Sequence, residues 1–148
     1  MFFVKQVTEA LTASSPTVLY FHGNAGNIGH RLMNVKGFVQ MLGCNVCLLE
    51  YRGYGHSDGS PSEDGLYMDA QAALDYLVGR PDVDQRKIIV FGRSLGKCII
   101  TYVHDVVKFP ISYFPKSSAK LNSCSWVSHI FYQFFGCFRS QSILESKF

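Results

Sequence analysis

The chain has 148 residues, which suits one small domain or a piece of a larger one, because domains usually run to about 100–200 residues. Its composition is 47% hydrophobic, 14% aromatic and 17% charged, with enough apolar side chain for a core and too little charge for a disordered chain. The net charge is +3 and no run of five or more basic residues occurs. We therefore exclude electrostatic binding to nucleic acid or to an anionic membrane as the main function.

The first clear element is a predicted buried strand over residues 17–21, a short apolar run. A glycine-rich loop, residues 23–29, then opens a predicted helix that runs to Leu42. Residues 45–51 are typical of a second buried strand, and a glycine-rich turn segment, residues 52–59, follows it. The apolar face of the helix is predicted to contain Leu32, Val35, Phe38, Val39 and Leu42.

A second helix has a well-formed start signal. Ser60 is the predicted cap, Pro61 suits the first turn, and Glu63 completes a capping box. The helix is predicted to end near Gly79. A third buried strand follows over residues 87–91. Strands that alternate with helices in this way predict an α/β fold with a parallel sheet.

Both ends of the chain carry weaker signals. The first sixteen residues have room for one strand, at about Phe2–Val7. After the third strand, β-branched residues would make a poor helix by propensity, and residues 109–148 lack clear periodicity. Residues 1–96 hold twelve of the thirteen glycines with a net charge of −1, whereas residues 97–148 have a net charge of +4. The composition therefore changes abruptly at Lys97.

The five cysteines are an odd number, and the first residues show no secretory leader, so we expect reduced thiols. Cys44 and Cys47 have no second pair at zinc spacing, and they are expected to be buried structural thiols. Residues 92–97 miss the spacing of a phosphate-binding loop, and residues 23–29 miss that of a dinucleotide site. We therefore predict no metal site and no cofactor.

The segment Gly92-Arg93-Ser94-Leu95-Gly96 has the glycine-x-serine-x-glycine pattern of a nucleophile elbow, directly after a predicted strand. In such a turn the serine is strained, and its hydroxyl is lifted above the sheet. Side chains two positions before and after it would collide with the strand and the helix, so Gly92 and Gly96 are predicted to be structural. Ser94 is the candidate nucleophile. An ordinary tight strand-to-helix turn is the alternative.

The segment His22-Gly23-Asn24-Ala25 follows the strand at residues 17–21. In a fold with a nucleophile elbow, the loop after this strand supplies one backbone N–H to an oxyanion hole, and the residue after the nucleophile supplies another. We therefore predict the backbone N–H groups of Asn24 and Leu95 as the oxyanion donors, with His22 and Gly23 in the oxyanion loop. A glycine-rich loop that only turns the chain is the alternative.

Four segments in the same order and spacing carry a family resemblance: Tyr20–Leu32, Glu50–Ser57, Gly65–Tyr67 and Phe91–Gly96. Together they resemble the α/β-hydrolase superfamily, and more narrowly its Bem46-like branch, over about residues 16–96. The resemblance implies a serine hydrolase that acts on acyl esters or thioesters, with Ser94 as nucleophile. Related branches include protein depalmitoylases.

The resemblance ends after the elbow, where Lys97-Cys98 stand in place of the family's second glycine and small residues. The family's acid and histidine lie on later loops, and only 54 residues follow Ser94. We therefore expect a partial α/β-hydrolase fold, a parallel sheet with flanking helices whose C-terminal part is missing, and little or no turnover. Its predicted parts are an N-terminal segment 1–16, a partial hydrolase domain 17–96 and a divergent tail 97–148.

Three further histidines are candidates for a replacement base. His104 lies on an element that leads away from the active-site edge, and His129 lies in the patternless tail, so neither is expected to serve. His56 with Asp58 is a conceivable surrogate pair, against the alternative of a solvated turn. No recognisable triad acid or histidine is therefore predicted.

A rival hypothesis is a non-catalytic truncated isoform that associates with a full-length relative. The family resemblance places the strand before Ser94 at the centre of the sheet, so ending the chain soon after it would leave an open edge. Such an edge favours self-association or pairing with a homologue. Family members are often anchored to membranes, but no anchor is recognised here, so the expected location is cytoplasmic or peripheral to a membrane.

Overall fold

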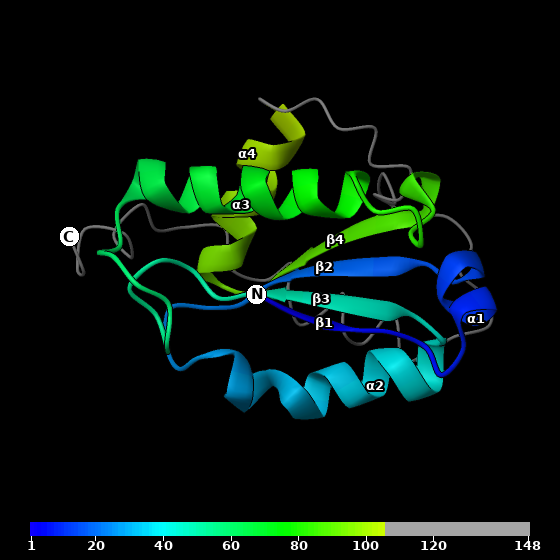
Figure 1. Ribbon diagram of the computed structural model, residues 1–148. Helices are drawn as coiled ribbons and strands as arrows, with labels where there is room; N and C mark the ends of the chain where they lie inside the picture. Colours follow the sequence, from blue (N-terminus) through cyan, green and yellow to red (C-terminus); the bar gives the residue numbers. More distant parts are fainter. Residues whose placement is uncertain (106–148) are drawn as a thin grey trace, which may run out of the picture. The chain divides into compact units, whose positions relative to one another are not determined.

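A four-stranded mixed sheet forms in the part of the chain that the computed structural model describes, residues 1–105 (Figure 1). β2 pairs in parallel with both β3 and β4, whereas β1 pairs antiparallel with β3. The predicted parallel arrangement is confirmed for three strands, and the predicted N-terminal strand is present but shorter. The strands, in the spatial order β1-β3-β2-β4, are β1 (Phe2–Val4), β2 (Thr17–Phe21), β3 (Asn45–Leu49) and β4 (Ile88–Gly92).

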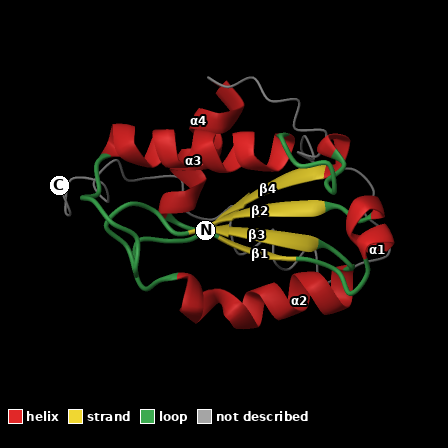
Figure 2. Cartoon of the chain, viewed as in Figure 1, coloured by secondary structure: helices red, strands yellow, loops and turns green. Residues whose placement is uncertain are grey.

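Helices cover both faces of this sheet. Figure 1 shows α2 (Leu32–Leu42) on one face, with α3 (Glu63–Val78) and α4 (Leu95–Asp105) on the other, and Figure 2 shows the same elements by type. The short helix α1 (Glu9–Ser14) joins β1 to β2. Two 3-10 turns, Ile28–Arg31 and Gln85–Lys87, precede α2 and β4. Within residues 1–105, no helix is long and apolar enough to cross a membrane.

The two central strands are buried along their whole length, which explains their continuous apolar sequences. Successive side chains of a strand point to opposite faces of the sheet. One face of β2 and β3 packs against α2, and the other lies under α3 and α4 (Figure 1). The core on the α2 side consists of Val18, Tyr20, Val35, Cys44, Val46 and Leu48.

Helix α2 has a narrower buried face than its spacing predicted. The Val35 side chain is buried, and the Phe38 and Val39 side chains pack against the core. Leu32 and Leu42, however, remain 49% and 38% exposed. Leu32 is only the first helical residue, because the preceding turn is a 3-10 helix, and Leu42 is the last. Both ends of α2 therefore lie outside the contact with the sheet.

Helix α3 begins two residues later than predicted, because Ser62 is its cap and not Ser60. The Ser62 hydroxyl accepts a hydrogen bond of 3.1 Å from the Gly65 amide. This cap places Glu63 and Asp64 in the first turn, where negative charge is favourable. Pro61 stays outside the helix. The predicted end at Gly79 is confirmed.

Helix α4 forms despite its β-branched sequence. Ile99 and Val103 are buried, and burial of such side chains outweighs a weak propensity. The helix crosses residue 96, where the predicted domain ended, and continues to Asp105. The side chain of His104 and the whole of His129 lie outside the described residues, as does most of the predicted tail.

A buried asparagine connects the amino-terminal segment to the sheet. The Asn45 side chain donates to the Thr12 carbonyl (2.9 Å) and to the Thr17 hydroxyl (3.1 Å). Its Oδ1 atom accepts from the Gln6 amide at 3.1 Å. Asn45 is the first residue of β3 and is fully buried. Residues 6–12 are thus attached to the start of β3 by polar contacts.

Candidate functional site

Ser94 occupies the sharp turn between β4 and α4. Its φ angle is 53°, and it is the one non-glycine residue with a positive φ among residues 1–105. The backbone on either side is tightly packed: a Cβ on Gly92 would overlap the Gly96 carbonyl, and a Cβ on Gly96 would overlap the Phe21 carbonyl. Ser94 itself is exposed. The two glycines thus permit a turn that presents the serine hydroxyl to solvent.

The loop after β2, residues 22–27, lies beside Ser94. The parallel register pairs Phe21 of β2 with Gly92 of β4, so both strands end at the same edge of the sheet. The Arg93 amide donates a hydrogen bond of 3.0 Å to the Phe21 carbonyl. A Cβ on Gly23 would lie 3.3 Å from the Cβ of Ser94. The structure therefore brings the predicted loop and the predicted nucleophile together.

The two predicted N–H donors belong to elements that lead into this edge. Leu95 is buried and is the first residue of α4, so its N–H is one of the helical amides that have no partner within the helix. Asn24 is half-buried, and its side-chain oxygen accepts a hydrogen bond of 2.6 Å from the Tyr54 hydroxyl. Leu95 directly follows Ser94, and Asn24 directly follows Gly23, which lies against Ser94.

His22 is fully buried and has no contact with solvent. Its Nδ1 lies 2.8 Å from the Gly23 carbonyl. Its Nε2 lies 3.1 Å from Oε1 of Glu50, a carboxylate that is itself 8% exposed. Burial lowers the pKa of the imidazole, against the opposing effects of the Gly23 carbonyl and the Glu50 carboxylate. His22 therefore packs inside the protein at the start of the predicted oxyanion loop.

Two tyrosines enclose His22. The Tyr51 ring lies 4.4 Å from the imidazole and the Tyr54 ring 5.6 Å, both between centroids. The Tyr51 hydroxyl donates to the His22 carbonyl at 2.9 Å, and burial raises the pKa of this phenol well above its ordinary value. Sequence reasoning missed Glu50, Tyr51 and Tyr54 as site residues. The sequence signal that could have found Glu50 was a charged residue directly after a buried apolar strand.

Ser94 has no base among the described residues. Among residues 1–103, whose side chains the structure describes, no hydrogen bond connects its hydroxyl to a histidine or a carboxylate. His56 and Asp58 are exposed, and Asp58 lines a surface pocket with Arg52 and Asp69 that does not include Ser94. The surrogate pair is therefore not assembled beside the serine.

The cysteines fit a structural interpretation. Cys44 and Cys47 are free and buried, as predicted, and burial raises the pKa of the Cys47 thiol to about 12. A thiol of this kind is a weak metal ligand and a weak nucleophile at neutral pH. In the part of the chain that the structure describes, no group of three or more histidine, cysteine, aspartate or glutamate side chains is placed to hold a metal ion.

Comparisons with known proteins place this geometry in a family. The model of the alpha/beta hydrolase fold matches residues 16–105. The alpha/beta hydrolase domain-containing protein WAV2 of Arabidopsis thaliana is 54% identical over 97 residues, which cover 66% of this chain and 30% of WAV2. Protein bem46 of Schizosaccharomyces pombe is 52% identical over 86 residues, which cover 58% of this chain and 29% of bem46.

A solved structure has the same fold. The crystal structure of an alpha-beta hydrolase from Vibrio vulnificus has a TM-score of 0.58 at 27% identity, over 87% of this chain and 51% of that one. The match to the curated relatives spans about 30% of their length. The resemblance to the Bem46-like branch is confirmed. From the matched motifs, the sheet and the solved relative, we conclude that the chain belongs to the α/β-hydrolase family.

Proposed function

We propose that this chain carries the nucleophile region of a serine hydrolase that cleaves acyl esters or thioesters, with Ser94 as the nucleophile. The observation that carries the proposal is the Ser94 backbone, with a φ of 53° at an exposed turn. A left-handed conformation costs an ordinary L-residue about 1–2 kcal/mol. Strain of this kind is concentrated at functional sites. Membership of the α/β-hydrolase family supports the same role.

The proposed reaction forms an acyl-enzyme. Ser94 Oγ attacks the acyl carbonyl carbon, and the carbonyl electron pair moves to the oxygen. The backbone N–H groups of Asn24 and Leu95 stabilise this oxyanion. The carbonyl then re-forms as the bond to the leaving group breaks, and the alcohol or thiol departs with the serine proton. Water hydrolyses the acyl-serine to the acid and restores the serine hydroxyl. The closeness of Gly23 to Ser94 supports this arrangement, because a side chain on Gly23 would crowd the serine.

The 148-residue chain is expected to turn over slowly. No histidine or carboxylate among residues 1–103, whose side chains the structure describes, is hydrogen-bonded to Ser94, so we expect the hydroxyl to keep its proton at neutral pH. Loss of the base removes most of the rate, and about 10³–10⁴-fold over water remains from the oxyanion hole and from binding. We expect hydrolysis of p-nitrophenyl butyrate and of a palmitoyl thioester, the finer substrate class that the resemblance implies, to stay close to that of Ser94→Ala.

Selective phosphonylation of Ser94 tests the proposal. The chain is incubated with a fluorophosphonate, and the modified serines are mapped by mass spectrometry. We expect slow modification at Ser94 that exceeds modification at Ser60, another exposed serine. Ser94→Ala should remove the main product, and Ser60→Ala should leave it unchanged. Modification spread evenly over the exposed serines would overturn the proposal.

A second role, association with a longer relative, is favoured by the order of the sheet. β4 pairs with β2 and is the last strand in the order β1-β3-β2-β4 among the described residues. An unpaired strand edge offers N–H and C=O groups to another chain. Light scattering of the purified chain, alone and with a full-length relative, measures this. A monomer that also fails to bind the relative would contradict the second role.

A further inference from the structure

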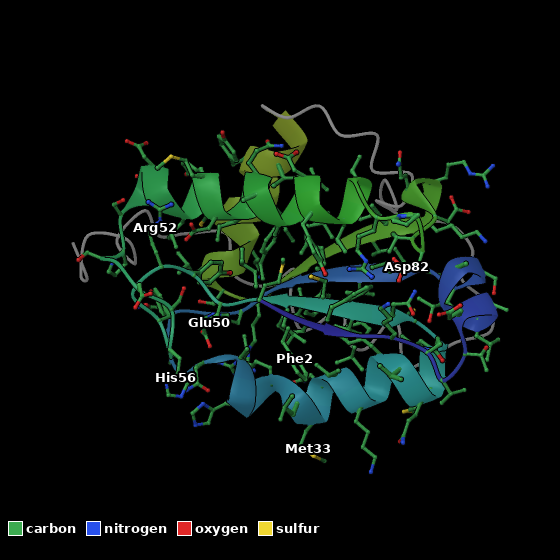
Figure 3. The ribbon with its side chains drawn as sticks, viewed as in Figure 1. Phe2, Met33, Glu50, Arg52, His56 and Asp82 are labelled. Carbon is green, nitrogen blue, oxygen red and sulfur yellow. The ribbon has the colours of Figure 1, made fainter. Side chains whose placement is uncertain are left out.

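We propose that Glu50 positions the 22–27 loop, an inference that rests on the proposed function of this loop in binding the oxyanion. Glu50 directly follows β3, and Figure 3 shows it near the carboxyl end of the sheet. Its side chain is 8% exposed. A buried carboxylate is costly unless other groups interact with it. The groups that contact Glu50 show which segment of the chain the buried carboxylate holds in place.

The two carboxylate oxygens contact the two ends of the loop. Oε1 lies 3.1 Å from Nε2 of His22, the first residue of the loop. Oε2 accepts a hydrogen bond of 3.1 Å from the amide of Ile28, the residue directly after the loop. One side chain directly after β3 thereby contacts both ends of the loop that contains Asn24.

The turn after β3 is shaped to enclose this carboxylate. Gly55 has a φ of 51°, and a Cβ at that position would lie 2.5 Å from Oε2 of Glu50. The positive φ favours glycine at this position, and a side chain there would displace the carboxylate. Further contacts hold the middle of the loop, because Tyr54 donates to Asn24 and the Arg31 guanidinium donates to the Ala25 carbonyl. Glu50 differs from both in contacting the two ends.

The position of the hydrogen on His22 determines which residue at position 50 can keep both contacts. Nδ1 faces the Gly23 carbonyl, and a carbonyl only accepts, so Nδ1 carries the hydrogen. In the neutral imidazole Nε2 is then an acceptor, so its 3.1 Å contact with Oε1 of Glu50 is attractive when one proton lies between the two atoms. A glutamine at position 50 has both groups needed, because its amide N–H donates to Nε2 while its oxygen accepts from Ile28. Glu50→Gln should therefore preserve the loop, and Glu50→Ala should release both ends.

Amide hydrogen exchange of the full chain, resolved by NMR, tests the role. We expect Glu50→Ala to speed exchange at residues 24–28 at least tenfold relative to amides of β2, and Glu50→Gln to stay within about threefold of the wild type. Glu9→Ala, which removes an exposed carboxylate, is the matched control. The proposal is overturned if Glu50→Ala leaves the loop within twofold of the wild type, or if Glu50→Gln loosens it equally.

A second variant covers the case in which Glu50→Ala does not fold. Ile28→Pro deletes the single N–H that reaches Oε2, at the first position of a 3-10 turn where proline is tolerated. Asn27 before it is extended (φ −142°, ψ −178°), as a residue before proline should be. Faster exchange at residues 24–27 supports the role, and unchanged exchange opposes it. Neither measurement uses Ser94 chemistry, so unselective fluorophosphonate labelling counts against the proposed function alone.

Discussion

The carbonyl group of Phe21 occupies the space that a side chain on Gly96 would need. Phe21 ends β2, and Gly96 is the second residue of α4. The same carbonyl accepts a hydrogen bond of 3.0 Å from the Arg93 amide. One backbone group thus determines how closely the turn at Ser94 approaches the start of the 22–27 loop.

Gly96→Ala should destabilise the fold because its Cβ would overlap the Phe21 carbonyl, which belongs to a central strand and has little freedom to move. Overpacking of this kind costs about 1–3 kcal/mol. Urea unfolding followed by circular dichroism measures the loss. Gly37→Ala is the control: nothing lies within 4 Å of that Cβ, so the change should stabilise α2 by about 0.5–1 kcal/mol. Equal midpoints for the two variants would contradict the packing argument.

Ser94→Gly should unfold at a higher temperature than Ser94→Ala. A positive φ suits glycine, whereas alanine keeps the strain of the serine backbone. We expect the glycine variant to be more stable by about 1 kcal/mol, measured by thermal unfolding. At an ordinary backbone conformation glycine is the less stable of the two, because it gains more entropy on unfolding. An alanine variant that melts higher would therefore show that Ser94 is not strained.

The sequence predicted the strands of the sheet, but it did not predict the contacts that hold the 22–27 loop. Apolar runs identified β2, β3 and β4. β2 and β3 are buried along their whole length, and a strand buried on both faces must be largely apolar, whereas in β4 buried residues alternate with half-buried ones. Ser94 and its glycines are local in sequence, so a spacing pattern could locate them. The contact between His22 and Glu50 joins residues 28 positions apart and depends on the register of β2 against β3. No local pattern specifies that pairing.

Local sequence also failed to predict two features of the helices. Propensity argued against α4, yet burial of Ile99 and Val103 decides its conformation. Ser60 and Ser62 are both good caps by residue type, and in the structure it is the Ser62 hydroxyl that accepts from the Gly65 amide. Tertiary contacts outweigh local preference where two local solutions are close in free energy.

Asn45→Ala should cost about 2–4 kcal/mol, because it leaves the Gln6 amide, the Thr12 carbonyl and the Thr17 hydroxyl without their buried partner. Chemical denaturation measures the change in free energy. Asn34→Ala, at an exposed position of α2, should change stability by less than about 0.5 kcal/mol and serves as the control. Comparable losses in the two variants would show that the Asn45 contacts contribute little.

Asp82 should make the fold sensitive to acid. Hydrogen bonds from Arg80 (2.7 Å) and Lys5 (2.6 Å) hold the pKa of its carboxyl well below the usual 3.8. The native state therefore binds this proton less readily than the unfolded chain, so the stabilisation is complete above about pH 4 and declines as the pH falls further. Because the side chain is 25% exposed, Asp82→Asn should cost only about 0.5–1 kcal/mol at pH 7. Urea unfolding from pH 7 to pH 2 should show this difference shrinking below pH 4, with Asp58→Asn as the exposed control; a difference independent of pH would refute the linkage.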